Sequence, residues 1–235
     1  MTTTAAGAPG QVLHVEDVTP SLRILRVGRP GGLTFAAGQY VKMGLAGLRL
    51  GSFSIASAPH ETFLEFCIER IAGGRLTPRL FAVGVGDHLE VSDRAKGRLR
   101  LHPAARQHLL VGTVTGIAPL RSLVRDALHR GMRTRITVLH GASHHDELPY
   151  REEFEDLAAA NEHITYRPTI SRRGEGRNAT WTGATGRVDP LALDVAASMD
   201  PDTTHVIATG NSGMVANVRT ALGAKGFPVA TEAFD

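Results

Sequence analysis

The sequence contains a single cysteine, Cys67, among its 235 residues. One cysteine can form no disulfide within the chain, and it cannot supply the four thiolates of an iron–sulfur cluster. Long apolar runs are missing too, since no stretch approaches the roughly 20 consecutive apolar residues that cross a bilayer. The opening residues 1–10 have neither the charged nor the apolar region of a signal peptide. These absences predict a cytoplasmic protein with no membrane partner and no internal cluster.

Aromatic residues are scarce, with three tyrosines and one tryptophan, and the formal net charge is only +3. The Lys and Arg residues are scattered, so the modest basic excess favours an acidic protein partner or an anionic ligand over a nucleic acid. Hydrophobic residues at 42% and charged residues at 21% are ordinary for a globular protein. A chain of this length is expected to form two domains.

The first half of the chain has short alternating segments separated by glycine-rich breaks. This pattern predicts an antiparallel β-barrel over residues 11–104, after a flexible tail at 1–10. The expected strands include residues 21–27, 40–43, 63–68 and 88–91. One short helix is expected to start at Thr77 and Pro78, because threonine is a good N-cap and proline is tolerated in the first turn.

The second half alternates between apolar strand-like runs and helical periods. Strands are expected at residues 108–111, 136–139, 164–169 and 206–208, most of them followed by a segment with helical apolar spacing. Such alternation predicts an α/β domain with a parallel sheet over residues 105–235. The domain boundary is placed between His102 and His108.

Three glycine-containing segments could carry chemistry. Residues 112–119 lie between a strand and a helix, where backbone N–H groups and a helix N-terminus can approach a phosphate. Residues 51–59 and 73–78 offer an aromatic ring, hydroxyls and a helix start, which suit a flavin and its pyrophosphate. Each segment alone has an ordinary alternative, namely a steric βα turn, a Ser-rich packed strand and a routine helix cap.

Together, these segments follow a recognisable order. A Gly-Gln pair, a Phe-Ser-Ile-Ala-Ser segment, a Gly-Arg-Leu-Thr turn and a Gly-Asp pair stand at residues 38–39, 53–57, 74–77 and 86–87. In this order and spacing they resemble the ferredoxin–NADP reductase family, specifically its shorter bacterial members without a fused ferredoxin domain. The resemblance extends from about Gly38 to the end of the sequence. It implies a flavin-binding β-barrel followed by an NADP-binding α/β domain.

In the barrel, the resemblance assigns the residues around FAD. Phe53 would stack on the isoalloxazine ring, and Ser54 would hydrogen-bond near its N5 atom. The family's arginine position is Gly51 here, so Arg49 or Arg75 would supply the missing charge. The other flavin-site residues that it implies are Ile55, Ser57, Cys67, Ile68, Glu69 and Gly74, with Leu76 and Thr77 holding the pyrophosphate.

In the second half, the family motif Gly-Thr-Gly-Thr-Gly-x-Ala-Pro corresponds to residues 112–119, with Val114 replacing the central glycine. A valine there narrows the approach of the backbone to a ligand. Thr209 stands where the family has a cysteine beside the reacting nicotinamide, and its hydroxyl would bond the carboxamide. Glu232 and Phe234 resemble the acidic-then-aromatic ending of the family, in which the aromatic ring covers the flavin until nicotinamide displaces it. With Ser54, these three residues are expected to act in catalysis. The remaining NADP contacts that the resemblance implies are Gly112, Thr115, Gly116, Pro119, Ser171, Arg172, Gly210 and Met214.

The implied activity is transfer of hydride from NADPH to bound FAD, with electrons passed to an acidic carrier protein, ferredoxin or flavodoxin. Ser171 and Arg172 follow an expected strand, and a hydroxyl with a guanidinium suits the 2′-phosphate of NADPH. Two alternatives stay open: an NAD(P)H:flavin reductase that releases reduced flavin, and the reductase component of a multicomponent oxygenase.

Several polar features have simpler interpretations. His144 and His145 are adjacent histidines that are expected to be solvated, and no matching ligands lie at metal-site spacing, so no metal is predicted. The acidic pairs at 146–147 and 152–153 look like charge bias at helix N-termini. Residues 181–187 are expected to form a turn that could edge the nucleotide site.

Overall fold

The computed structural model describes residues 8–234. The chain divides into two compact units, residues 1–100 with 121–126, and residues 101–120 with 127–235. We predicted a domain boundary at residue 104 and did not predict that residues 121–126 belong to the first unit. Residues 1–7 of the predicted tail lie outside the described part, whereas residues 8–10 belong to a strand and not to a tail.

The first unit is a six-stranded antiparallel sheet in the order β4-β3-β6-β1-β2-β5, as the alternating sequence predicted. The backbone N–H of Ala56, just after β4, donates to the carbonyl of Glu65 on β5 at 2.7 Å, so the two edge strands approach each other. Inward-facing side chains of alternate residues fill the resulting barrel, including Val27, Val41, Leu64 and Phe66. The strands are β1 (Ala8–Thr19), β2 (Leu22–Gly28), β3 (Tyr40–Gly44), β4 (Gly51–Ser54), β5 (Phe63–Glu69) and β6 (His88–Val91).

The short helix α1 (Thr77–Leu80) forms where it was predicted, but its cap is different. Leu76 is the N-cap residue and makes no side-chain cap, while Pro78 stands at the helix start as expected. The Thr77 hydroxyl instead accepts a hydrogen bond from the backbone N–H of Ile71 at 2.9 Å. The prediction of Thr77 as the N-cap is therefore wrong, because the hydroxyl closes the preceding turn.

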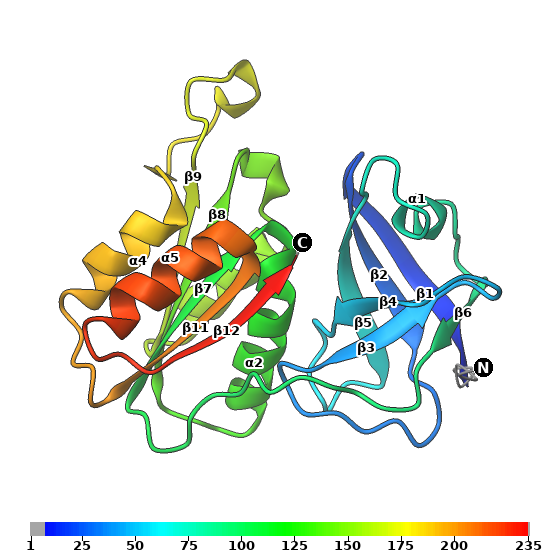
Figure 1. Cartoon of the computed structure of the whole chain (residues 1–235), viewed down its shortest axis with the longest axis horizontal. Coiled ribbons are helices and arrows are strands. Elements are labelled where there is room, and N and C mark those ends of the chain that lie inside the picture. Colours follow the sequence, from blue (N-terminus) through cyan, green and yellow to red (C-terminus); the bar gives the residue numbers. More distant parts are fainter. Residues whose placement is uncertain (1–7, 235) are drawn as a thin grey trace. The chain divides into compact units, whose positions relative to one another are not determined.

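The second unit is a parallel sheet in the order β10-β9-β8-β7-β11-β12, confirming the predicted α/β domain (Figure 1). Helices α4 and α5 pack together over one face of it, and Leu109, Val111, Leu139 and Val206 belong to the core on that side. Its strands are β7 (Gln107–Thr113), β8 (Arg135–Ala142), β9 (Ile164–Ile170), β10 (Ala184–Thr185), β11 (Thr204–Asn211) and β12 (Val229–Phe234). Its α-helices are α2 (Ile117–His129), α3 (Arg151–Ala160), α4 (Val188–Ala196) and α5 (Ser212–Gly223), with 3₁₀ turns η1 (Val114–Gly116), η2 (His145–Glu147) and η3 (Gly176–Asn178).

Strand β7 occupies the middle of this sheet and creates its topological switch point. The chain passes from β7 to β8 on one side, and β11 lies on the other side of β7. In open α/β sheets, ligands bind at the carboxyl ends of the strands beside such a point. The last residue of β7 and the turn that follows it, residues 113–116, are therefore the expected place for a nucleotide.

Among residues 8–234, no helix combines the length and the apolar composition that crossing a bilayer demands.

Candidate functional site

In the first unit, the predicted flavin motif lies on β4, where Phe53 and Ser54 are partly exposed. The Phe53 ring meets Phe66 edge-on, with centroids 6.4 Å apart, so the barrel core supports one edge of the ring. A Cβ atom on Gly51 would lie 2.9 Å from both the Phe53 ring and the Leu76 side chain. Gly51 thus lets Phe53, the predicted ring-stacking residue, pack beside Leu76, which belongs to the predicted pyrophosphate turn. That juxtaposition fits a ligand with a planar ring and a phosphate.

Several other predicted flavin residues turn their side chains into the protein. Ile55 and Ile68 belong to the barrel core, and Cys67 and Ser57 are also buried. The Ser57 hydroxyl accepts a hydrogen bond from the backbone N–H of Glu65 at 3.1 Å. Because their side chains are turned inward, these residues would meet a flavin through their backbone, and their place in the flavin site stays a prediction. Of the remaining two, Glu69 is exposed and Gly74 is half-buried.

The Cys67 thiol is buried in the strand after the turn at residues 60–62. Burial raises the pKa of this thiol well above its ordinary value, and the carboxylates of Glu65 and Glu69 raise it further. A thiol of this kind stays protonated at neutral pH and is a poor nucleophile. Cys67 therefore acts as a small packing residue.

A buried ion pair supports the flavin motif, and the sequence pattern did not reveal it. Glu65 on β5 has no exposed surface and pairs with Arg26 and with Arg121, the latter at 2.9 Å. Arg121 also donates to the carbonyl of Ala56 at 2.9 Å, and Ser122 donates to the carbonyl of Ser57 at 2.6 Å. All these groups belong to the first unit. They fix the backbone that follows Phe53 and Ser54.

In the second unit, the predicted nucleotide residues meet at the carboxyl ends of β7 and β11. The Thr113 hydroxyl accepts from the backbone N–H of Asn211 at 2.8 Å, and the Thr209 hydroxyl donates to the carbonyl of Gly116 at 2.6 Å. A Cβ atom on Gly116 would clash with the Thr209 carbonyl, and one on Gly210 would clash with the Thr113 hydroxyl. Both glycines are thus required by the close approach of the two backbones.

Two of the predicted contacts have other roles in this structure. Thr209 is fully buried, and its single hydroxyl hydrogen is donated to Gly116. It braces the loop, and the expected bond between its hydroxyl and a carboxamide stays a prediction. Met214 packs its side chain into the core beneath α5, and Pro119 is also buried. The residue missed here is Asn211, whose side-chain oxygen caps α5 by accepting from the Met214 N–H at 3.1 Å.

The remaining loop positions divide by exposure. Gly112 is buried, and Thr115 is half-buried in the turn η1. Val114, where the family motif has glycine, has a positive φ of 45°. This is the left-handed region that glycine adopts freely, so Val114 has a backbone conformation that suits glycine better than valine.

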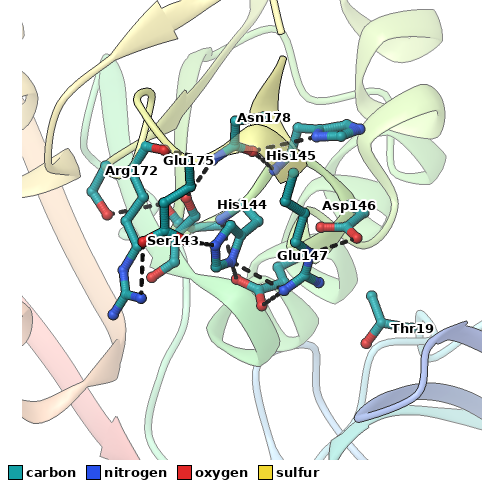
Figure 2. A network of polar contacts seen from close by, with 12 residues as sticks. Thr19, Ser143, His144, His145, Asp146, Glu147, Arg172, Glu175 and Asn178 are labelled. Carbon is teal, nitrogen blue, oxygen red and sulfur yellow. Dashed lines mark hydrogen bonds and ion pairs between the residues drawn. The ribbon is translucent and has the colours of Figure 1, made fainter. Parts of the chain in front are cut away.

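At the neighbouring strand ends, a polar network joins residues 143–147 to residues 172–178 (Figure 2). The backbone N–H of Ser171 donates to Ala142 at 2.9 Å, which places Arg172 just beyond β9. The exposed Arg172 guanidinium lies 3.3 Å from one Glu175 oxygen, and the other Glu175 oxygen lies 2.7 Å from His144 Nε2. An arginine exposed at this edge can bind a phosphate.

The histidine pair is not solvated as predicted. His144 is buried and pairs with Glu147 at 3.1 Å as well as with Glu175. The hydrogen bond to Glu175 raises the pKa of His144, with a further contribution from Glu147, and the same bond lowers the pKa of Glu175. Arg177 donates to Asp146 at 2.9 Å and to Glu147 at 3.0 Å. The described residues hold no group of three or more His, Cys, Asp or Glu placed to bind a metal ion.

The last two predicted catalytic residues lie on β12, the edge strand beside β11. Glu232 stands opposite Thr209, and Phe234 stands opposite Asn211. Their register therefore places them at the same end of the sheet as the β7 loop.

Comparison with known proteins agrees with this arrangement. Residues 110–220 match the family model of the oxidoreductase NAD-binding domain. A ferredoxin NADP⁺ reductase from Neisseria gonorrhoeae, solved with bound FAD and NADP, superposes with a TM-score of 0.84 at 22% identity, covering 96% of this chain and 98% of that one. The fold and its sites thus define a two-domain oxidoreductase with a flavin-type barrel and a nicotinamide-nucleotide domain.

Sequence relatives narrow the class to one family. The ferredoxin–NADP reductase A of Sorangium cellulosum is 34% identical over 234 residues, which cover 92% of this chain and 82% of that protein. The ferredoxin–NAD(P)⁺ reductase component of the naphthalene 1,2-dioxygenase system of Pseudomonas putida is 32% identical over 167 residues, covering 69% of this chain and 50% of that protein. The chain belongs to the ferredoxin–NADP reductase family.

Proposed function

We propose that this protein is an FAD-dependent reductase that takes hydride from NADPH and delivers electrons to ferredoxin or flavodoxin. The observation that carries the proposal is the loop at the switch point, which Thr113, Thr209 and the two glycines lock against β11. The gonococcal structure of the same fold, which holds FAD and NADP, supports it. When bound, FAD supplies the redox chemistry, since it accepts a hydride and returns its electrons singly.

The first unit would hold and orient the flavin. Phe53 offers an apolar ring supported by Phe66, and Ser54 offers a hydroxyl on the same strand. Gly51 gives the ring its room beside Leu76, and the Glu65–Arg121 pair keeps the backbone after Ser54 in place. These groups position a reactant and perform no acid–base step, which suits hydride transfer between two stacked rings.

The second unit would bind the dinucleotide. Backbone N–H groups of residues 113–116 and the start of α2 suit a pyrophosphate. We assign the 2′-phosphate to Ser171 and Arg172, because a charge-assisted hydrogen bond to a phosphate is worth roughly 1.5–3 kcal/mol. That difference corresponds to a preference for NADPH over NADH of at least about tenfold.

Arg172→Ala tests this assignment, and Arg173→Ala is its matched control. Arg173 is the neighbouring exposed arginine, whose guanidinium donates to the Asn178 carbonyl at 3.1 Å. We expect Arg172→Ala to lower kcat/KM for NADPH by about tenfold or more and to leave that for NADH nearly unchanged. Arg173→Ala should preserve the preference. Equal kcat/KM for the two nucleotides in the parent protein would contradict the assignment.

The acceptor we propose is an acidic carrier protein, because the basic excess lies in the first unit. Residues 1–100 contain twelve Lys or Arg and eight Asp or Glu, whereas the remainder contains fourteen and fifteen. Within a short segment, Arg94, Lys96, Arg98 and Arg100 are all exposed, and among residues 8–234 none of the four pairs with a carboxylate. Complementary charge would steer an acidic carrier to this segment.

A salt series on carrier reduction tests this partner. NADPH-driven reduction of ferredoxin or flavodoxin should slow steeply as salt rises, because the Debye length is only roughly 10 Å at 0.1 M. The double variant Arg98→Glu with Arg100→Glu should slow it at low salt and leave reduction of ferricyanide by the same enzyme unchanged. If free flavin were turned over far faster than any carrier, with no salt effect on the carriers, the flavin-reductase alternative would be favoured.

The oxygenase-reductase alternative is also compatible with the comparisons, since two relatives are named as reductase components of oxygenases. Such a role would require a cluster outside these 235 residues, because Cys67 is the single cysteine among them. A carrier from an oxygenase system would then be reduced faster than a general ferredoxin or flavodoxin.

A further inference from the structure

Val114 is held in a conformation that valine rarely adopts. Its φ of 45° lies in the left-handed region, and Val114 and Tyr150 are the two non-glycine residues with positive φ among residues 8–234. A β-branched residue there is a genuine outlier that costs free energy, and it persists only where its surroundings impose it. Some part of the structure must therefore hold this residue in place.

The backbone of Val114 is held by a buried histidine. His140 on β8 has no exposed surface, and its Nε2 lies 3.3 Å from the Val114 carbonyl. A carbonyl can only accept, so Nε2 bears the hydrogen and Nδ1 is the acceptor. Nδ1 then accepts from the Tyr166 hydroxyl, which lies 3.0 Å away.

The histidine is itself held rigidly. The Tyr166 ring stacks on Phe154 of α3, with centroids 5.1 Å apart and an interplanar angle of 15°. Burial lowers the pKa of His140 to about 3, and burial raises the pKa of Tyr166, so neither group ionises near neutral pH. The hydrogen-bond pattern from Tyr166 through His140 to Val114 is thus fixed.

The side chain of Val114 is also engaged. It packs against a buried apolar cluster made of Ala142, Leu148, Ile170 and Trp181. On the far side of the same turn, Thr209 holds the Gly116 carbonyl. The turn between β7 and α2 is therefore braced on both sides, by β8 through His140 and by β11 through Thr209.

We propose that His140 is a positioning residue for the dinucleotide, because with Tyr166 it fixes Val114 in the left-handed conformation that shapes the loop of residues 113–116. This inference rests on the proposed function, which assigns the loop to NADPH. Because His140 has no exposed surface, it acts through the loop that its hydrogen bond holds. A glycine at residue 114 would adopt positive φ freely. Here the hydrogen bond from His140 holds valine in that conformation instead.

Two substitutions at residue 140 distinguish the effect of this hydrogen bond from the effect of side-chain packing. In His140→Gln, the amide nitrogen reaches the place of imidazole Nε2 and can still donate to Val114, whereas the shorter His140→Asn reaches only that of Nδ1. Titration of the flavin-loaded enzyme with NADP⁺ by calorimetry should show about tenfold weaker binding for His140→Asn and less than about threefold for His140→Gln. The kcat with saturating NADPH should change less than KM.

Val114→Gly tests whether His140 acts through residue 114. Glycine adopts positive φ without strain, so His140 becomes dispensable in that background. We expect His140→Asn to weaken NADP⁺ binding by less than about threefold when Val114→Gly is present, against about tenfold in the parent. Equal effects in both backgrounds would overturn the proposal, since additivity means that the two residues act independently.

A measurement without nucleotide distinguishes the two ways in which the inference could fail. Amide hydrogen exchange of residues 113–117 in the ligand-free protein should speed up in His140→Asn and in Tyr166→Phe, and much less in His140→Gln. Unchanged exchange in all three would overturn the role of His140 itself. Faster exchange with unchanged NADP⁺ affinity would overturn its premise, the assignment of the loop to the dinucleotide.

Discussion

Acid should destabilise the second unit, because two of its buried histidines are neutral in the folded protein. Burial lowers the pKa of His140 to about 3 and that of His108 to about 4, from an ordinary value of 6.5. In the unfolded chain both take up a proton as the pH falls below 6.5, but in the folded chain they do not. Stability is therefore complete above about pH 6.5 and is lost as the pH falls toward the folded pKa values.

The size of the loss follows from these values. At about pH 5.5 each histidine costs about 1.4 kcal/mol of unfolding free energy, so the pair costs about 3 kcal/mol. The raised pKa of His144 changes stability in the opposite direction as the pH falls, so each variant is compared with the parent protein at the same pH. His140→Gln and His108→Gln should each recover about 1.4 kcal/mol of the loss.

Urea unfolding at about pH 7.5 and about pH 5.5 measures this loss. Fluorescence of Trp181, the single tryptophan and a buried residue of the second unit, reports the transition. His88→Gln is the control, because that exposed side chain keeps contact with water in both states. If the parent and both buried-histidine variants lost the same free energy between the two pH values, the reasoning would be refuted.

Two further predictions concern the first unit. Arg121→Met should lower the unfolding free energy by about 3 kcal/mol, because it leaves the buried Glu65 carboxylate with Arg26 alone. Arg125→Met, at a partly exposed pair with Glu61, should lower it by about 1 kcal/mol or less. The urea midpoint followed by circular dichroism measures both. Cys67 should react with a thiol-specific disulfide reagent only as fast as the barrel opens, because its thiol is buried and stays protonated; immediate reaction of the native protein would contradict this.

Periodicity and motif order predicted most of the fold. Strands of alternating or wholly apolar character, such as residues 63–69 and 107–113, form where the sequence placed them, because one or both faces are buried. The cap of α1 was mispredicted, since whether a Thr77 hydroxyl caps a helix or closes the preceding turn depends on contacts that local propensity does not encode.

The site was predictable in its position but only partly in its side chains. Glycine spacing located the loop at 112–116, because the turn after β7 approaches the end of β11 too closely for a Cβ atom on Gly116. Whether a side chain faces a ligand or the core depends on the pairing register, and the motif could not show that Ile55, Ser57 and Met214 point inward. The Glu65–Arg121 pair joins residues far apart in the sequence, and its one local signal was a glutamate inside the apolar run at 63–68.

The visible spectrum of the purified protein, recorded without oxygen before and after NADPH, tests whether this chain binds FAD and reduces it with NADPH. We expect bound FAD in proportion to protein, loss of the flavin colour on addition of an equimolar amount of NADPH, and its return when oxidised ferredoxin or flavodoxin is added. A protein that is colourless and takes up no FAD, or a bound flavin that NADPH leaves oxidised, would contradict it.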